Sequence, residues 1–470
     1  MVFNSFNFWL IFPVVFIIYW AIPKTHNKYR NMFLLIVSYL LYLNWKPVYG
    51  LILLGVTSVT YYGGIVIEND KNNKRKHLVW CLAFLTAFPL LLFKYYNFVN
   101  ESITSILEIV GLHFSLPGLN WAIPVGISFF TFQALGYMLD VYHGRTRAEK
   151  SLIDYLLFVS FFPQVTSGPI SKADELLPQI KKAHSFSYEQ GKEGLRLLLW
   201  GMFFKLVVAD RLGMYVDTVY ANYEHISGLN LLLGSAFYSF QIYGDFAGYS
   251  YMAIGIAKLL GFDLINNFNR PYFSATITEF WRRWHISLTR WLTQQIYIPL
   301  GGSRCSKLRC YINIMITFLV SGVWHGANLT FIIWGAIHGF IQIVEKSLGI
   351  NKGEKTPKYI LPFRVIFTFV IVTIAWIFFR MPTFMDSINV IKRIIMEPGT
   401  FNSGLMMASD MLMLVIGLFV MLAKDTKDEF FKNTPLLGNK LVKWTVYVVL
   451  FAMILNFGIL DGGSFIYVSF

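Results

Sequence analysis

The sequence predicts an all-α membrane protein that crosses the bilayer many times. Of its 470 residues, 56% are hydrophobic and only 14% are charged, whereas a soluble domain carries about 25% charged residues. Apolar runs recur along the chain, and short basic loops separate them. We expect a single domain over residues 1–470, with about 11 to 13 transmembrane or re-entrant segments of ~20 residues each.

The net charge of +14 is explained by loops that stay in the cytoplasm. We therefore expect the membrane as a partner and no nucleic acid. Three cysteines form no disulfide framework, and without further Cys or His near Cys305 and Cys310 we expect no metal site.

The N-terminal part of the chain predicts four spans followed by an interrupted region. The apolar runs cover residues 6–22, 31–45, 49–67 and 78–93. Basic loops follow the first and the third of them, so both loops lie inside and the first residues lie outside. In the mixed segment 94–120 we expect an interfacial helix.

A further span is predicted at 121–139, where Pro124 and Gly126 should break or kink the helix. Residues 155–170 are apolar but contain three Pro or Gly residues, so we expect a re-entrant segment there. The remaining apolar runs are residues 195–208, 230–262 (with Asp245 in its middle), 360–379, 404–422 and 441–460.

His285 lies in the segment EFWRRWHISLTRWL. Thr276-Ile-Thr-Glu279 fits a capping box, so we expect one amphipathic helix to begin there. Its aromatic face would be formed by Trp281, Trp284, Leu288 and Trp291. On spacing alone, the simpler interpretation is an interfacial anchor with His285 as an ordinary polar-face residue.

His325 lies in Trp-His-Gly within a long apolar stretch. A histidine in such a place is by default a functional-site hypothesis, although a hydrogen bond between helices would equally account for it. A desolvated histidine stays neutral and can act as a base toward a hydroxyl that attacks an acyl carbonyl. There is no Gly-x-Ser-x-Gly elbow to supply a covalent nucleophile. On a continuous helix His338 would lie near the far side from His325, so it has a supporting role at most.

Several longer segments, in this order, resemble the membrane-bound O-acyltransferases of the bacterial alginate O-acetyltransferase type. They cover roughly residues 120–340, the expected family core. The segments are PVGISFFTFQALGYMLDVYHG (124–144), FFPQVTSGPI (161–170), QIYGDFAGYSYMAIGIAKLLGF (241–262), NFNRPY (267–272), EFWRRWHISLTRWL (279–292), YIPLGGSR (297–304) and VWHGANLTFIIWGAIHG (323–339).

The resemblance implies helices around a central cavity that is reachable from both faces of a bacterial cytoplasmic membrane. It also implies acyl transfer from a cytoplasmic thioester donor, acetyl-CoA, with no bound cofactor. A separate extracytoplasmic acetyltransferase partner would then place the acetyl group on alginate, cellulose or peptidoglycan.

By the same resemblance, His325 is the general base at the acceptor hydroxyl. His285 orients the thioester or stabilises the oxyanion, and Arg282 or Arg283 contributes charge. The supporting or cavity-lining residues are Asp245, Asn267, Trp284 and Trp324.

Two alternatives stay open at this point. One is D-alanyl transfer to teichoic acid from a carrier protein, by proteins that share this fold and these histidines. The other is a transporter or flippase, which the absence of an internal repeat disfavours.

Overall fold

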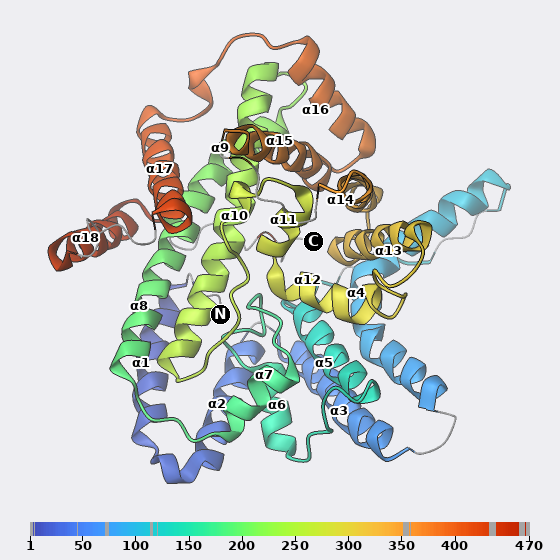
Figure 1. The fold of residues 1–470 in the computed structure, drawn as a ribbon, viewed down its shortest axis with the longest axis vertical. Coiled ribbons are helices and arrows are strands. Elements are labelled where there is room, and N and C mark those ends of the chain that lie inside the picture. The colour runs from blue at the N-terminus through green and yellow to red at the C-terminus, as the bar shows by residue number, and fades with distance from the viewer. Residues whose placement is uncertain are drawn as a thin grey trace. The chain divides into compact units, whose positions relative to one another are not determined.

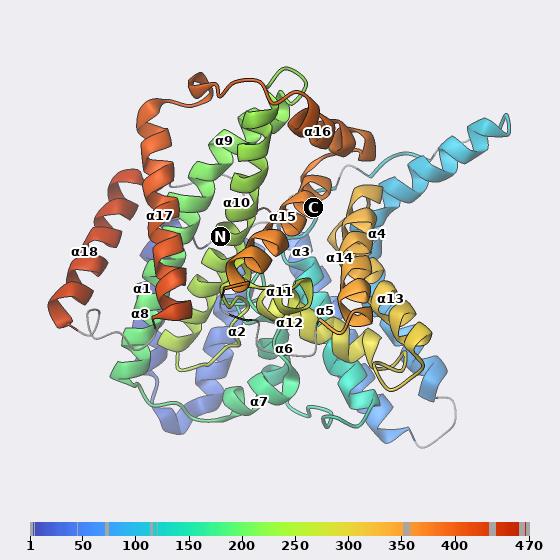
Figure 2. The ribbon, with the colours of Figure 1, turned by 45° about the horizontal axis from the view of Figure 1, so that its top comes forward.

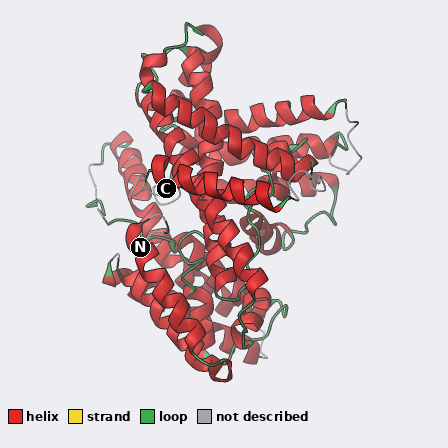
Figure 3. Ribbon diagram, turned by 90° about the vertical axis from the view of Figure 1, so that its left-hand side faces the viewer, coloured by secondary structure: helices red, strands yellow, loops and turns green. Residues whose placement is uncertain are grey.

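The computed structural model is helical throughout the part of the chain that it describes (Figures 1 and 3). That part comprises residues 3, 5–44, 46–70, 75–112, 116–119, 121–350, 357, 359–431, 439–459 and 466, and it contains no strand. The all-α prediction is therefore confirmed.

The chain divides into two compact units. Unit 1 contains Met1–Leu195 and Ala253–Ile265, and unit 2 contains Arg196–Met252 and Asn266–Phe470. The single domain over 1–470 and its core at 120–340 stay predictions.

Unit 1 contains the predicted N-terminal helices. They are α1 (Phe6–Ala21), α2 (Asn27–Leu43), α3 (Pro47–Asn69), α4 (Arg75–Ile109), α5 (Ile127–Tyr142), α6 (Leu152–Ser160) and α7 (Ala173–Lys181). Two boundaries differ from the prediction. The helix that contains the fourth apolar run does not end near residue 93, because α4 continues through Pro89 to Ile109. The next helix starts later than Trp121, because Gly126 has a φ of 75° and only Ile127 begins the helical ladder.

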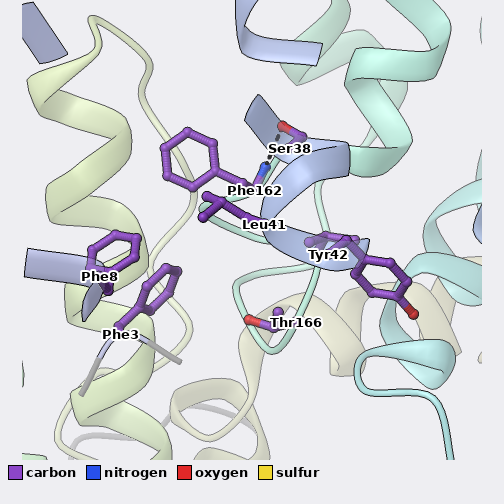
Figure 4. Close-up of a pocket in the computed structure, with 8 residues that line it drawn as sticks. Phe3, Phe8, Ser38, Leu41, Tyr42, Phe162 and Thr166 are labelled. Atoms are coloured by element: carbon purple, nitrogen blue, oxygen red, sulfur yellow. Dashed lines mark hydrogen bonds between the residues drawn. The ribbon is translucent and has the colours of Figure 1, made fainter. Parts of the chain in front are cut away.

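The apolar segment 155–170 is half helix and half turn. After α6 ends at Ser160, the chain folds back through a series of turns, and the N–H of Gly168 donates to the carbonyl of Gln164 at 2.9 Å. The Ser38 hydroxyl of α2 accepts a hydrogen bond from the N–H of Phe162 at 3.1 Å (Figure 4). A small pocket lies beside this bond, lined by Phe3, Phe8, Ser38, Leu41, Tyr42, Phe162, Val165 and Thr166. None of the predicted site residues lines it.

Unit 2 carries the segments on which the functional hypotheses rest. After the end of α8 (Tyr188–Met202) come a π-helix (Phe203–Ala209), α9 (Asp210–Ala221), α10 (Gly228–Leu259, which continues into unit 1), α11 (Ile277–Arg283), α12 (Ile286–Leu292), α13 (Lys307–His325), α14 (Leu329–Ser347), α15 (Leu361–Arg380), α16 (Phe384–Met396), α17 (Ala408–Phe430) and α18 (Lys440–Phe457).

Helices α13 and α14 form a hairpin and lie side by side (Figure 2). A side chain at Gly322 would collide with the carbonyl oxygen of Phe331, and one at Gly335 with that of Phe318. These two glycines let the two backbones meet.

By length and composition, four helices of the described chain can each cross a membrane: α3, α4 (from Lys76), α15 and α18. The pair α1 and α2 is bent by 100° and makes a fifth if it counts as one span. The sequence predicted about 11 to 13 segments of ~20 residues. That larger number also included re-entrant segments.

Candidate active site

The segment around His285 begins with the predicted capping box. Thr276 Oγ1 accepts a hydrogen bond from the N–H of Glu279 at 3.0 Å, and α11 starts at the next residue, Ile277. The Glu279 carboxylate reaches back to the N–H of Ala275 at 2.8 Å, one residue earlier than in the ideal box. The predicted start of the helix is thus confirmed.

The expectation of one continuous amphipathic helix through residue 292 is wrong. The helix is interrupted at Trp284 and His285. His285 has the left-handed backbone conformation, with φ 42° and ψ 53°. Only two non-glycine residues in the described chain have a positive φ, the other being Arg270. His285 is therefore not a residue of one continuous helical face, as spacing alone would place it.

Asn267 holds this break in place. Its backbone carbonyl accepts from the N–H of Ile286 at 2.9 Å, and its Oδ1 accepts from the N–H of Ser287 at 3.1 Å. Its Nδ2 donates to Ser250 Oγ at 3.3 Å. Asn267 therefore satisfies the first N–H groups of α12, which no helical carbonyl can reach.

His285 is completely buried and lies against aromatic rings. Its ring centroid is 4.6 Å from that of Phe246 and 5.9 Å from that of Trp324. Such desolvation favours the neutral imidazole over the imidazolium.

His325 is the last residue of α13 and is also buried. Its ring lies 4.6 Å from Trp324, 4.8 Å from Trp334 and 5.1 Å from Phe379. The structure therefore places both predicted histidines against the ring of Trp324, although 40 residues separate them in the sequence.

His338 does not lie where a continuous helix from His325 would place it. It does not lie on the same helix as His325, because the chain turns at Gly326–Asn328 and α14 folds back along α13. Its ring and that of His325 both contact Trp334, at 5.1 Å and 4.8 Å. Neither ring nitrogen of His338 has a hydrogen-bond partner among the described residues.

The other predicted residues occupy different positions. Trp284 is buried and its ring lies 5.0 Å from Phe268 and 5.2 Å from Trp376. Asp245 forms a buried ion pair with Lys205 at 2.7 Å. The N–H of Ile466 donates to the other Asp245 carboxylate oxygen at 2.7 Å.

The two arginines differ in surroundings. Arg282 is exposed. Arg283 pairs with Glu279 at 2.6 Å and with Glu429 at 3.1 Å. Burial raises the pKa of Glu429, but the hydrogen bond and charge of Arg283, together with Arg270, outweigh this and the pKa is lowered. Arg283 thus fixes α11 through Glu429, at the end of α17.

Sequence analysis missed Glu345 of α14, which is buried. Its carboxylate accepts hydrogen bonds from the N–H of Ile277 at 2.6 Å, the N–H of Thr278 at 2.9 Å and the Thr278 hydroxyl at 2.7 Å. It caps the N-terminus of α11, where a negative charge is favourable. The available signal was a carboxylate at the end of an otherwise apolar run, FIIWGAIHGFIQIVE.

Glycine and alanine substitutions at His285 and His338 test the backbone conformation of these two positions. At His285 we expect glycine to be more stable than alanine by about 1 kcal/mol, because only glycine adopts a positive φ without cost. At His338, inside α14, alanine should be the more stable by about the same amount. Thermal unfolding of the four variants measures both differences, and equal signs at the two positions would contradict the left-handed turn.

A second test concerns the unbonded imidazole of His338. His338→Phe should raise the free energy of unfolding by about 1 kcal/mol, because the buried nitrogens lose their desolvation cost while the stacked ring is kept. The ring is nearly parallel to that of Phe280, at 5°. Thermal unfolding checks this, and a fall in stability would indicate a hydrogen-bonded role for the imidazole.

Among the described residues there is no group of three His, Cys, Asp or Glu side chains that could hold a metal ion.

Comparisons with known proteins identify the family. Residues 145–418 match the membrane-bound O-acyltransferase family. The chain is 38% identical to a probable alginate O-acetylase of Pseudomonas aeruginosa, over 81% of this chain and 72% of that protein. It is 34% identical to a peptidoglycan O-acetyltransferase of Helicobacter pylori, over 83% and 79%, and 26% identical to a teichoic acid D-alanyltransferase of Bacillus subtilis, over 72% and 87%. The chain therefore belongs to the membrane-bound O-acyltransferase family, and it is a membrane-embedded acyltransferase.

Proposed function

We propose that this protein moves acetyl groups from acetyl-CoA in the cytoplasm to the outer face of a bacterial cytoplasmic membrane, for O-acetylation of an envelope polysaccharide. The observation that carries the proposal is the packing of His285 and His325 on one buried tryptophan, Trp324. The similarity to the alginate and peptidoglycan O-acetyltransferases supports the choice of acetyl group and of polysaccharide.

In this proposal His325 acts as the general base. Its neutral imidazole accepts the proton of the acceptor hydroxyl while the hydroxyl oxygen attacks the thioester carbonyl. A tetrahedral intermediate forms, the carbon–sulfur bond breaks, and the imidazolium returns the proton to the departing thiolate. His285, which also contacts Trp324, orients the thioester or donates a hydrogen bond to the oxyanion.

The surrounding residues exclude water and fix the geometry. Trp284 and Trp324 keep the site apolar, so that the thioester is not hydrolysed. Asn267 and Asp245 are positioning residues, the first through the turn at His285 and the second through α10. Arg282 is exposed and can meet an anionic donor, whereas Arg283 is engaged by Glu279 and Glu429.

D-alanyl transfer to teichoic acid from a carrier protein is the second candidate. The D-alanyltransferases of Bacillus subtilis and Streptococcus thermophilus are only 26% and 28% identical to this chain. This lower similarity favours acetyl transfer. Because the chain belongs to an acyltransferase family, we prefer acyl transfer to the transporter or flippase alternative. As a partner we propose an extracytoplasmic acetyltransferase that completes transfer to the polysaccharide.

The test measures esters of the cell-envelope glycans in a deletion strain, with and without the wild-type gene. Alkali-released acetate and alkali-released D-alanine are quantified from the same samples. We expect acetate to disappear in the deletion strain and to return with the wild-type gene, while D-alanine stays constant. Loss of D-alanine alone would establish the second candidate, and no change in either would refute both.

A further inference from the structure

A cluster of four polar side chains lies where α13 begins and α14 ends. Cys310 Sγ is 2.8 Å from Lys346 Nζ and 3.3 Å from the hydroxyl of Tyr297. The Ser303 hydroxyl is 2.9 Å from that of Tyr297 and 3.3 Å from Lys346 Nζ. Cys310 and His325 are 15 residues apart on α13, or about 22 Å at 1.5 Å per residue, so the cluster is separate from the candidate active site.

Among the described residues, no carboxylate pairs with the charge of Lys346. Its partners among the described residues are Cys310, Ser303 and Tyr297. The neighbouring Glu345 is occupied by the N-terminus of α11. Of the three partners, the thiol is the group that ionises most readily, so the charge of Lys346 favours the thiolate form of Cys310.

The position of Cys310 in the helix adds to this effect. Ser306 caps α13, and the N–H of Cys310 donates to the Ser306 carbonyl at 2.9 Å. The sulfur thus lies in the first turn, at the positive end of the helix dipole. Thiols at helix N-termini and next to lysine are the ones that react as thiolates.

We propose that Cys310 and Lys346 form a peroxide-reactive pair, whose oxidation joins α13 and α14 by a covalent sulfur–nitrogen bond. This goes beyond the acyl-transfer function and does not depend on it. No carboxylate in the part of the chain that the structure describes competes for the lysine, and Cys310 Sγ and Lys346 Nζ lie 2.8 Å apart.

The chemistry has two balanced steps. The thiolate attacks hydrogen peroxide: a sulfur–oxygen bond forms, the oxygen–oxygen bond breaks, and the released hydroxide takes up a proton to form water, leaving a sulfenic acid on Cys310. The amine of Lys346, having lost a proton, then attacks the sulfur. The sulfur–nitrogen bond forms, the sulfur–oxygen bond breaks, and a second water leaves. The net change in the protein is the loss of two hydrogen atoms.

Burial selects a small oxidant over a larger electrophile. Cys310 is only 3% exposed, so a small oxidant reaches its sulfur more readily than a bulky thioester donor. The separation of about 22 Å along α13 also prevents an acyl group on Cys310 from passing directly to the site at His325.

Cys305 provides a matched control in the same region. Its thiol donates to the carbonyl of Gly302 at 3.4 Å and lies 3.7 Å from Asn313 Nδ2. It has no lysine or arginine partner among the described residues, so it lacks the feature that activates Cys310.

The experiment treats the purified full-length protein in detergent with hydrogen peroxide and maps the peptides by mass spectrometry. We expect a cross-linked Cys310–Lys346 peptide that is two hydrogen masses lighter than the sum of the two peptides, and that dithiothreitol separates. Hydrogen peroxide should oxidise Cys310 about ten-fold faster than Cys305, as measured by the thiols that iodoacetamide still labels after the peroxide is removed and the protein is denatured. Cys305→Ser should leave the cross-link unchanged.

Two lysine variants separate the steps. Lys346→Arg keeps the cation but not the amine, so Cys310 should still become a sulfenic acid, which dimedone traps once the protein is denatured, with no cross-link. Lys346→Met should slow the oxidation of Cys310 by peroxide. The proposal is overturned if Cys310 reacts no faster than Cys305, or if peroxide converts Cys310 to sulfinic acid while Lys346 stays free.

Discussion

Replacing His325 with glutamine is expected to lower acyl transfer by about 10²- to 10⁴-fold, because the side chain keeps its size but can no longer accept a proton from the acceptor hydroxyl. Glutamine is preferred to alanine here, since His325 is buried among Trp324, Trp334 and Phe379 and truncation would leave a cavity. The measurement is glycan-bound acetate in the deletion strain that carries the variant, at matched protein abundance.

His184→Gln is the matched control for this substitution. His184 lies in unit 1, where its Nε2 is 2.8 Å from the carbonyl of Gln179. Burial lowers the pKa of His184, so it too is held toward the neutral form, but it takes no part in the proposed site. Normal acetate in this variant and its loss in His325→Gln would support the base. More than half of the wild-type acetate in His325→Gln would refute the assignment.

Replacing Glu345 with alanine is expected to produce the largest loss of stability, about 2–4 kcal/mol, because two buried N–H groups and one hydroxyl lose a charged acceptor. The three groups belong to Ile277 and Thr278, at the start of α11. Since α11 leads directly into the turn at His285, acyl transfer should fall together with the unfolding temperature. Thermal unfolding in detergent and glycan acetate measure the two effects.

Two further carboxylate variants make this prediction specific. Glu345→Gln keeps one acceptor oxygen and should lose less stability than alanine. Glu193→Ala removes a partly exposed carboxylate whose partner is Lys258 at 3.3 Å, and such surface pairs contribute about 0–1 kcal/mol. If Glu345→Ala were as stable as Glu193→Ala, Glu345 would not be the cap of α11.

The sequence by itself determined the helical membrane class, the start of α11 and the two histidines of interest. Each rests on a local signal. Burying a long apolar run requires a helix in a bilayer, and a capping box acts within four residues. The histidines were identified because a polar side chain in apolar sequence is costly wherever the chain folds.

Only the tertiary structure decided how these parts meet. The helix breaks at His285 because Asn267, 18 residues earlier, supplies the hydrogen bonds that make a left-handed histidine tolerable. Glu345 caps α11, which begins 68 residues earlier in the sequence. Lys205 of the π-helix forms an ion pair with Asp245 of α10. Periodicity predicts which face of a helix is apolar, but not which distant group satisfies its free N–H groups or buried charges, since that depends on packing between elements.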